Sequence, residues 1–196
     1  MESLGVHQFA IHPTALISAC DFHARIQAER NLNLLESGDR LIGLVIGRPA
    51  ADPTEPVQIV DCCEVKHTST PFKLDEEFVC TRRRMLKKVD PTSDIVGWFC
   101  FGKALPADHK NIQEEFVRAS ATFAHDVTAN LRFGSVAVVF HDIDVHSVDA
   151  LPVSVFAMAA ESPRSLSAEV AFDAAEEIAM FVCPLSLRGG GWLANY

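Results

Sequence analysis

The chain has 196 residues, of which 48% are apolar and 22% are charged, and its formal net charge is −9. This length is enough for one sizeable hydrophobic core, and the composition is typical of a globular domain. The acidic balance argues against a nucleic-acid-binding protein as a whole, because neutralising phosphates needs an excess of Lys and Arg. We therefore expect no direct DNA binding. The overall charge does not exclude a local basic patch.

The sequence contains no targeting or membrane segment that we can identify. No charged region followed by an apolar stretch opens it, and no run of about 18 apolar residues occurs. The six cysteines form no Cys-x-x-Cys pair, and the adjacent Cys62 and Cys63 must point to opposite faces of a strand. We expect reduced thiols and a cytoplasmic protein without membrane contact.

The N-terminal part alternates between helical and strand periodicity. Residues 1–11 look like an entering strand, and Pro13 opens a helix to Glu29. The apolar run Leu41–Ile46 predicts a central strand, and Val57–Val65 predicts a second strand antiparallel to it. The helix that begins at Pro13 has one side that we expect to be buried, formed by Leu16, Ile17, Cys20 and Ala24.

Residues Leu74–Val89 predict a helix whose charges match its dipole, with acids in the first turn and bases in the last. The predicted buried stripe consists of Phe78, Met85, Leu86 and Val89. Basic side chains make this helix a candidate contact for an acidic partner or RNA, and a solvated helix face is the alternative. The candidate contact residues are Arg82, Arg83 and Lys87.

The stretch Asp94–Lys103 predicts a buried strand with an inaccessible Trp98. Asp108 is a plausible N-cap for a helix ending near Ala119, which would bury Ile112 and Phe116. Further along we expect a hairpin of Thr122–Ala129 and Ser135–Val145, strands at Pro152–Ala159 and Leu166–Phe172, and a helix at Ala174–Val182.

Two C-terminal features have alternative interpretations. Four side chains near the end of the hairpin could bind a metal: His141, Asp142, Asp144 and His146. Against this interpretation, no second group of ligands lies near them in the sequence. The glycine run beyond residue 187 predicts a tail that either docks on a partner or is disordered.

Three motifs in order resemble the MPN (Mov34) domain family: His12–Leu16, Arg40–Gly47 and Gly97–Phe99. The resemblance implies an MPN-type (cytidine-deaminase-like) α/β sandwich, with a mixed curved sheet flanked by helices. The domain organisation that we expect is an N-terminal strand or arm at 1–11, an MPN domain at 12–185 and a flexible tail at 186–196.

Catalytic members of this family are zinc isopeptidases, and the resemblance assigns their motif to Arg40, Cys100, Gly102, Lys110 and Gln113 in this sequence. A hydrolytic zinc needs three protein ligands, an open position for water and a carboxylate base. Glycine has no ligating side chain, glutamine is a poor ligand and arginine cannot act as a base. We therefore predict no enzyme activity, metal or cofactor; a metal-dependent isopeptidase is the alternative of another class.

Metal-free MPN subunits occur in initiation factor 3, the proteasome lid and the signalosome, where the resemblance implies pairing with a second MPN subunit. The segments Leu74–Gly102 and Phe181–Pro184 are most similar to subunit f of initiation factor 3. The prediction is a scaffold subunit that indirectly supports recruitment of the small ribosomal subunit; the lid and the signalosome are alternatives. The predicted interface residues are Leu16, Cys20, Ile112, Phe116 and Val117.

Overall fold

The computed structural model describes residues 9–31, 41–48, 55–69, 71–121, 136–141, 153–158 and 162–178. The helices are α1 (Pro13–Asn31), α2 (Glu76–Val89) and α3 (His109–Ala121), with a further helical stretch at residues 174–178. The strands are β1 (Phe9–Ile11), β2 (Ile42–Arg48), β3 (Val57–Glu64), β4 (His67–Ser69), β5 (Phe72–Leu74), β6 (Asp94–Phe101), β7 (Val136–Phe140), β8 (Val153–Ala157), β9 (Arg164–Leu166) and β10 (Ala168–Val170).

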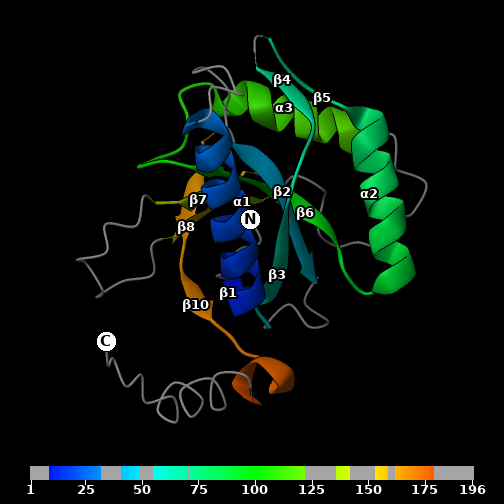
Figure 1. Ribbon diagram of the computed structural model, residues 1–196, viewed down its shortest axis with the longest axis vertical. Coiled ribbons are helices and arrows are strands. Elements are labelled where there is room, and N and C mark those ends of the chain that lie inside the picture. Colours follow the sequence, from blue (N-terminus) through cyan, green and yellow to red (C-terminus); the bar gives the residue numbers. More distant parts are fainter. Residues whose placement is uncertain are drawn as a thin grey trace, which may run out of the picture.

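Eight strands form one mixed sheet in the order β10-β1-β3-β2-β6-β7-β8-β9, and β4 pairs with β5 in a small separate sheet (Figure 1). The pairs β1–β10, β1–β3 and β6–β7 are parallel, whereas β2–β3, β2–β6, β7–β8 and β8–β9 are antiparallel. The predicted mixed α/β architecture is confirmed, and so is the antiparallel pairing of the second predicted strand with the first.

The sheet curls until its two edges are neighbours along the chain. The strands at its two ends, β9 and β10, are separated by Ser167 alone, and the Ser167 carbonyl accepts a hydrogen bond from Phe9 N–H at 3.2 Å. A single strand was predicted over Leu166–Phe172. That prediction was wrong, because the chain leaves one edge of the sheet after Leu166 and joins the other edge at Ala168.

Each face of the sheet has its own hydrophobic core. On one face α1 packs against a cluster that includes Val96, Phe99 and Val138, and on the other α3 packs against one that includes Trp98 and Cys100. Strand β6 therefore serves both cores. Trp98, Phe99 and Cys100 alternate between the two faces, and a register shift against β2 at Val96 lets Val96 and Trp98 face different cores. Trp98 is 0% exposed, as predicted.

Gly97 of β6 pairs with Val136 of the parallel strand β7. A Cβ atom at this position would be 1.9 Å from the Val136 carbonyl oxygen, a distance that no side chain can accept. The glycine thus permits the β6–β7 pairing. Strand β7 also pairs with β8, and the predicted hairpin partner Thr122–Ala129 lies outside the described residues.

The faces that α1 and α2 bury differ from the prediction. On α1 the buried side chains are Ala15, Ala19 and Phe22, while Ile17 is 68% exposed and both Cys20 and Ala24 face solvent. Two alanines at i and i+4 let the helix backbone lie close to β3, and Leu16 of the predicted side is partly buried against the same core.

On α2, Val79 is the fully buried residue and Leu86 is half-buried, whereas the predicted core residues Met85 and Val89 are exposed. Asp75 is the N-cap, accepting a hydrogen bond from Phe78 N–H at 2.9 Å. Among the described residues no helix has the length and apolarity to cross a membrane. The predicted boundary at 185 and the tail at 186–196 fall outside this part of the chain.

Candidate functional site

The end of β6 is where the predicted zinc motif would lie. Cys100 is 5% exposed, and burial raises the pKa of its thiol to about 12, so the sulfur carries its proton at neutral pH. Gly102 follows with φ +149°, and its N–H donates to the Phe140 carbonyl at 3.0 Å. This corner therefore offers a protonated thiol and a glycine, neither of which is a ready metal ligand.

The facing helix α3 supplies the other two described motif positions. Gln113 Oε1 accepts a hydrogen bond from the buried indole Nε1–H of Trp98 at 2.8 Å, and Phe116 stacks on the same indole. Lys110 is exposed to solvent. Gln113 thus provides the hydrogen-bond acceptor for the buried indole N–H. The sequence analysis missed this role because Trp98 lies fifteen residues away. Arg40 lies outside the described residues.

The predicted interface residues do not form one surface. Ile112 and Phe116 are 0% exposed and belong to the second core, so their assignment to an interface was wrong. Leu16 is half-buried against the first core, Cys20 is exposed on α1, and Val117 is 50% exposed on α3. Because α1 and α3 cover opposite faces of the sheet, these three side chains are not neighbours.

The three residues of the predicted basic contact on α2 have different environments. Arg83 donates two hydrogen bonds to the Asp94 carboxylate, both at 2.8 Å, and Lys87 Nζ lies 3.2 Å from the same group. Burial raises the pKa of Asp94, but the Arg83 hydrogen bonds outweigh it and the pKa is lowered. Arg83 and Lys87 are therefore engaged within the fold, whereas Arg82 remains exposed, with its guanidinium over the Phe78 ring.

Hydrogen bonds to Glu176 connect the start of α1 with the helical stretch at residues 174–178. We call this connection the Glu176 clasp. The Glu176 carboxylate accepts hydrogen bonds from His12 Nδ1 at 2.8 Å, from Thr14 N–H and hydroxyl at 3.2 and 2.7 Å, and from Asp173 N–H at 3.0 Å. Burial raises the pKa of Glu176, but these donors outweigh burial and lower it to about 2. The carboxylate is therefore charged and sits at the positive end of α1.

His12, Asp173 and Glu176 also have the chemistry of metal ligands, since one candidate atom from each lies within 4.8 Å of the others. The two carboxylates already have protein partners: Asp173 accepts from Glu176 N–H at 2.8 Å, and Glu176 accepts four hydrogen bonds. His12 Nδ1 contacts Glu176, whereas the buried His12 Nε2 has no hydrogen-bond partner among the described residues. The reciprocal Asp173–Glu176 pattern is a capping box. Hydrogen bonding thus accounts for the placement of both carboxylates.

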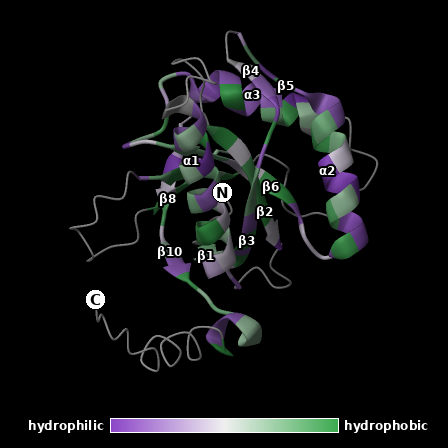
Figure 2. Ribbon diagram, viewed as in Figure 1, coloured by the Kyte–Doolittle hydropathy of each residue, from purple (hydrophilic) through white to green (hydrophobic). Residues whose placement is uncertain are grey.

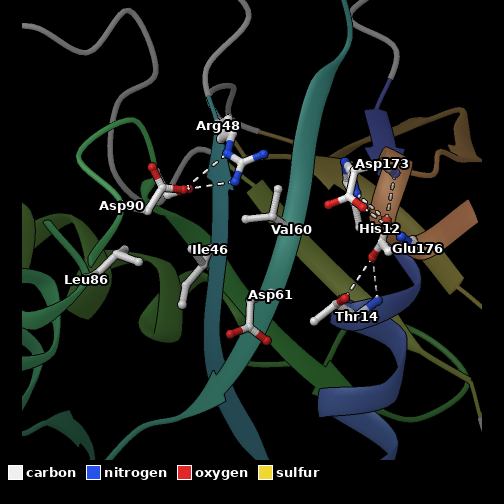
Figure 3. Close-up of a pocket in the computed structure, with 11 residues that line it drawn as sticks. His12, Thr14, Ile46, Arg48, Val60, Asp61, Leu86, Asp90, Asp173 and Glu176 are labelled. Carbon is white, nitrogen blue, oxygen red and sulfur yellow. Dashed lines mark hydrogen bonds and ion pairs between the residues drawn. The ribbon is translucent and has the colours of Figure 1, made fainter. Parts of the chain in front are cut away.

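An open pocket of about 270 Å³ lies between this clasp and a second polar pair, Arg48 and Asp90 (Figure 3). Arg48 donates two hydrogen bonds to Asp90, at 3.0 and 3.2 Å. Asp61 lies between the two polar pairs (Figure 3). The pocket is smaller than most small-molecule sites, which span roughly 300–1,000 Å³.

The predicted metal group near residue 141 is described only at His141. Its Nδ1 lies 3.1 Å from the Gly102 carbonyl oxygen and its Nε2 lies 2.8 Å from the Ser154 hydroxyl. Since the carbonyl only accepts, Nδ1 is the donor to Gly102. Both ring nitrogens thus hold the ends of β6, β7 and β8 together; Asp142, Asp144 and His146 lie outside the described residues.

Comparison with known proteins places the chain among relatives that are parts of complexes. It is 22% identical over 176 residues to COP9 signalosome complex subunit 6 of Oryza sativa subsp. japonica, covering 82% of this chain and 51% of the relative. It is 21% identical over 179 residues to COP9 signalosome complex subunit 6a of Arabidopsis thaliana, covering 82% and 56%. The chain thus spans about half the length of these relatives.

Both relatives are named as signalosome subunits, so they favour the predicted signalosome alternative over initiation factor 3. The model of the JAB1/Mov34/MPN/PAD-1 ubiquitin protease family matches residues 4–120, which is more than half of the chain. The matched segment contains α1, α2 and nearly all of α3, together with the central strands β2, β3 and β6. The chain therefore belongs to the JAB1/Mov34/MPN/PAD-1 family.

Proposed function

We propose that this chain is a non-catalytic MPN subunit of a multi-subunit complex of the signalosome type, in which it pairs with a second MPN subunit. The observation that carries the non-catalytic part is the corner between β6 and α3. There Cys100 is buried and protonated, Gly102 has no side chain, and Gln113 accepts the hydrogen bond of the Trp98 indole.

A hydrolytic centre at this corner would have to overcome two costs. Zinc binds thiolate rather than thiol, so Cys100 would first have to lose a proton against a pKa raised to about 12. Recruiting Gln113 to a metal would leave the indole N–H of Trp98 without this acceptor in the core. These costs support a role as a scaffold, in which function resides on surfaces rather than in a pocket.

The choice of complex is supported by the two signalosome relatives. Initiation factor 3, which the sequence motifs favour, and the proteasome lid are the competing assignments. All three share the expected pairing with a second MPN subunit, and they differ in the proteins that should accompany it. A role in recruiting the small ribosomal subunit belongs to the initiation-factor assignment alone.

Affinity purification of the tagged full chain with mass spectrometry tests the assignment. We expect signalosome subunits, including a second MPN protein, to co-purify. Recovery of initiation-factor or lid subunits instead would move the chain to that complex, and recovery of no MPN partner would contradict the scaffold role.

Zinc content and cleavage of ubiquitin chains test the non-catalytic assignment separately. The purified chain should contain no stoichiometric zinc and should leave ubiquitin chains intact. Bound zinc together with cleavage that disappears in Cys100→Ala would overturn the proposal. The exposed thiol variant Cys20→Ala is the matched control, because it removes a cysteine away from this corner.

A further inference from the structure

Strand β3 crosses the pocket shown in Figure 3, and two neighbouring residues of this strand, Val60 and Asp61, both line it. Adjacent side chains of a regular strand point to opposite faces, so this arrangement needs an irregularity. The pairing of β3 with β2 supplies one, since the register shifts between Ile46 and Gly47 and leaves Val60 without a partner. Such a β-bulge re-aims side chains, and here it brings the Asp61 carboxylate to the same pocket as Val60.

The pocket carries more negative than positive charge. Four carboxylates line it: Asp61, Asp90, Asp173 and Glu176. Arg48 pairs with Asp90, and His12 donates to Glu176, but in the part of the chain that the structure describes no Lys or Arg pairs with Asp61 or Asp173. Each of these two accepts one backbone hydrogen bond at 2.8 Å through Oδ1, and Oδ2 has no partner among the described residues. Figure 2 shows that β2 and β6 beside the pocket are largely hydrophobic, so this charge is local.

His12 contributes an acceptor atom that the described protein leaves unused. The Glu176 carboxylate is charged and can only accept, so Nδ1 of His12 is the donor in their 2.8 Å contact. When the ring is neutral, Nε2 is then a bare acceptor. The His12 side chain is 7% exposed, and its Nε2 is buried with no hydrogen-bond partner among the described residues. A buried acceptor without a donor costs free energy, so this atom favours a ligand that brings an N–H group into the pocket.

We propose that this pocket binds the guanidinium group of an arginine side chain that a partner protein presents. Its N–H groups donate to the free oxygens of Asp61 and Asp173 and, after a small movement of the pocket wall, to the shielded His12 Nε2. Guanidinium is the matching group because it has five donors in a rigid fork and is less strongly hydrated than an ammonium. The apolar lining residues Val60 and Leu86 contact its aliphatic stem. A volume of about 270 Å³ suits one side chain rather than a drug-sized ligand.

Three other ligands fit these groups less well. A lysine ammonium is a compact, strongly hydrated charge that would lose more water on entering the pocket. A divalent cation would find His12, Asp173 and Glu176 close together, but the Glu176 carboxylate already accepts two hydrogen bonds on each oxygen. Free arginine would bring its own α-carboxylate into an acidic pocket, where like charges repel. An arginine within a protein chain has no such group.

This inference deepens the proposed scaffold function and rests on it for the partner, because the relatives of this chain are named as subunits of a complex. The binding test uses the isolated full chain and needs no complex. If an arginine peptide binds the pocket but co-purification finds no MPN partner, the pocket stands and the scaffold assignment is wrong. If co-purification succeeds and the peptide does not bind, the scaffold role stands and this inference is removed.

The test is a ¹H–¹⁵N NMR titration of the full chain with acetyl-Gly-Arg-Gly-amide, in which the guanidinium is the only charge. Shift changes should gather at the amides of Thr14, Asp61 and Cys62, and the ¹⁵N resonance of His12 Nε2 should move as it accepts a hydrogen bond. A single side chain makes the contact, so we expect a dissociation constant of about 1 mM that rises at high salt. Citrulline in place of arginine removes the charge but keeps the shape, and lysine removes the fork but keeps the charge. Both control peptides and free L-arginine should bind more weakly by about fivefold or more.

Two single variants locate the contact by removing negative charge while keeping the local hydrogen bonds. Asp61→Asn and Asp173→Asn each retain an oxygen that accepts from the N–H groups of Cys62 and Glu176, so circular dichroism should show folded proteins. Each variant should weaken binding of the arginine peptide by about fivefold. Asp21→Asn is the matched control, since it removes an exposed carboxylate of α1 that does not line the pocket, and it should leave binding unchanged.

Three outcomes would overturn the inference: no binding of the arginine peptide, equal binding of the arginine peptide and either control peptide, or binding that neither Asp61→Asn nor Asp173→Asn weakens. Tighter binding of free L-arginine than of the peptide would assign the pocket to a small molecule instead. Addition of one equivalent of Mn²⁺ that broadens the Asp173 and Glu176 amides and displaces the arginine peptide would assign it to a divalent cation.

Discussion

Replacing Gln113 by leucine should destabilise the protein through the indole of Trp98. Trp98 is 0% exposed, and its Nε1–H donates to Gln113 Oε1 at 2.8 Å. Leucine keeps about the same volume but removes the acceptor, so a buried donor is left without this bond. An unsatisfied buried polar group costs about 1–3 kcal/mol, and we expect the free energy of unfolding to fall by that amount.

A double-mutant cycle separates this bond from everything else that Gln113 does. Trp98→Phe removes the indole N–H together with part of the ring, and in that background Gln113→Leu should cost little. The coupling energy between the two positions should be about 1–2 kcal/mol. Urea unfolding followed by far-ultraviolet circular dichroism is the appropriate assay, because tryptophan fluorescence changes with the substitution itself.

The exposed neighbour on the same helix, Asn111→Leu, controls for changes in helix propensity and surface polarity. It should shift the free energy of unfolding by less than about 0.5 kcal/mol. An equal cost of Gln113→Leu with and without the indole would refute the reasoning, since the cost would then not come from this hydrogen bond. Gln113 would then make no net contribution to the core through the Trp98 indole.

Three further predictions concern the fold and its titrating groups. Gly97→Ala places a Cβ 1.9 Å from the Val136 carbonyl oxygen, so the free energy of unfolding should fall by about 3 kcal/mol or more. The midpoint of urea unfolding should fall accordingly, and an unchanged midpoint would contradict the close approach. Glu176 has a folded-state pKa lowered to about 2, below its unfolded value of about 4.3, so its stabilisation is present above pH 4.3 and is lost as the pH falls toward 2. The stability difference between wild type and Glu176→Gln, about 1–3 kcal/mol, should therefore be constant from about pH 5 to 8 and shrink below pH 4, whereas the exposed Glu177→Gln should show no such loss. Finally, the buried Cys100, with its pKa raised to about 12, should resist iodoacetamide in the native protein at neutral pH, while the exposed Cys20 is alkylated; peptide mass spectrometry that finds both modified at equal rates would contradict this burial.

The sequence by itself determined the features that depend on one short stretch of chain. Helical spacing was enough to predict that α3 buries Ile112 and Phe116, both of which are 0% exposed. Strand alternation was enough to place Cys62 and Cys63 in different cores. The acids at the start of the predicted Leu74–Val89 helix indicated its first turn; the helix begins two residues later, at Glu76, because Leu74 belongs to β5 and Asp75 is the N-cap. Each of these follows from the fixed periodicity of the backbone and from local hydrogen bonding.

Tertiary structure alone decided which of two adjacent stripes on α1 and α2 faces the sheet. On α1, Ala15 and Ala19 face β3 because small side chains allow close packing, and Ile17 is left exposed. On α2, Arg83 turns inward because Asp94 neutralises it, which carries Met85 and Val89 to the surface. Periodicity fixes which residues share a stripe, but the identity of the buried stripe depends on the shape and charge of a surface contributed by distant parts of the chain.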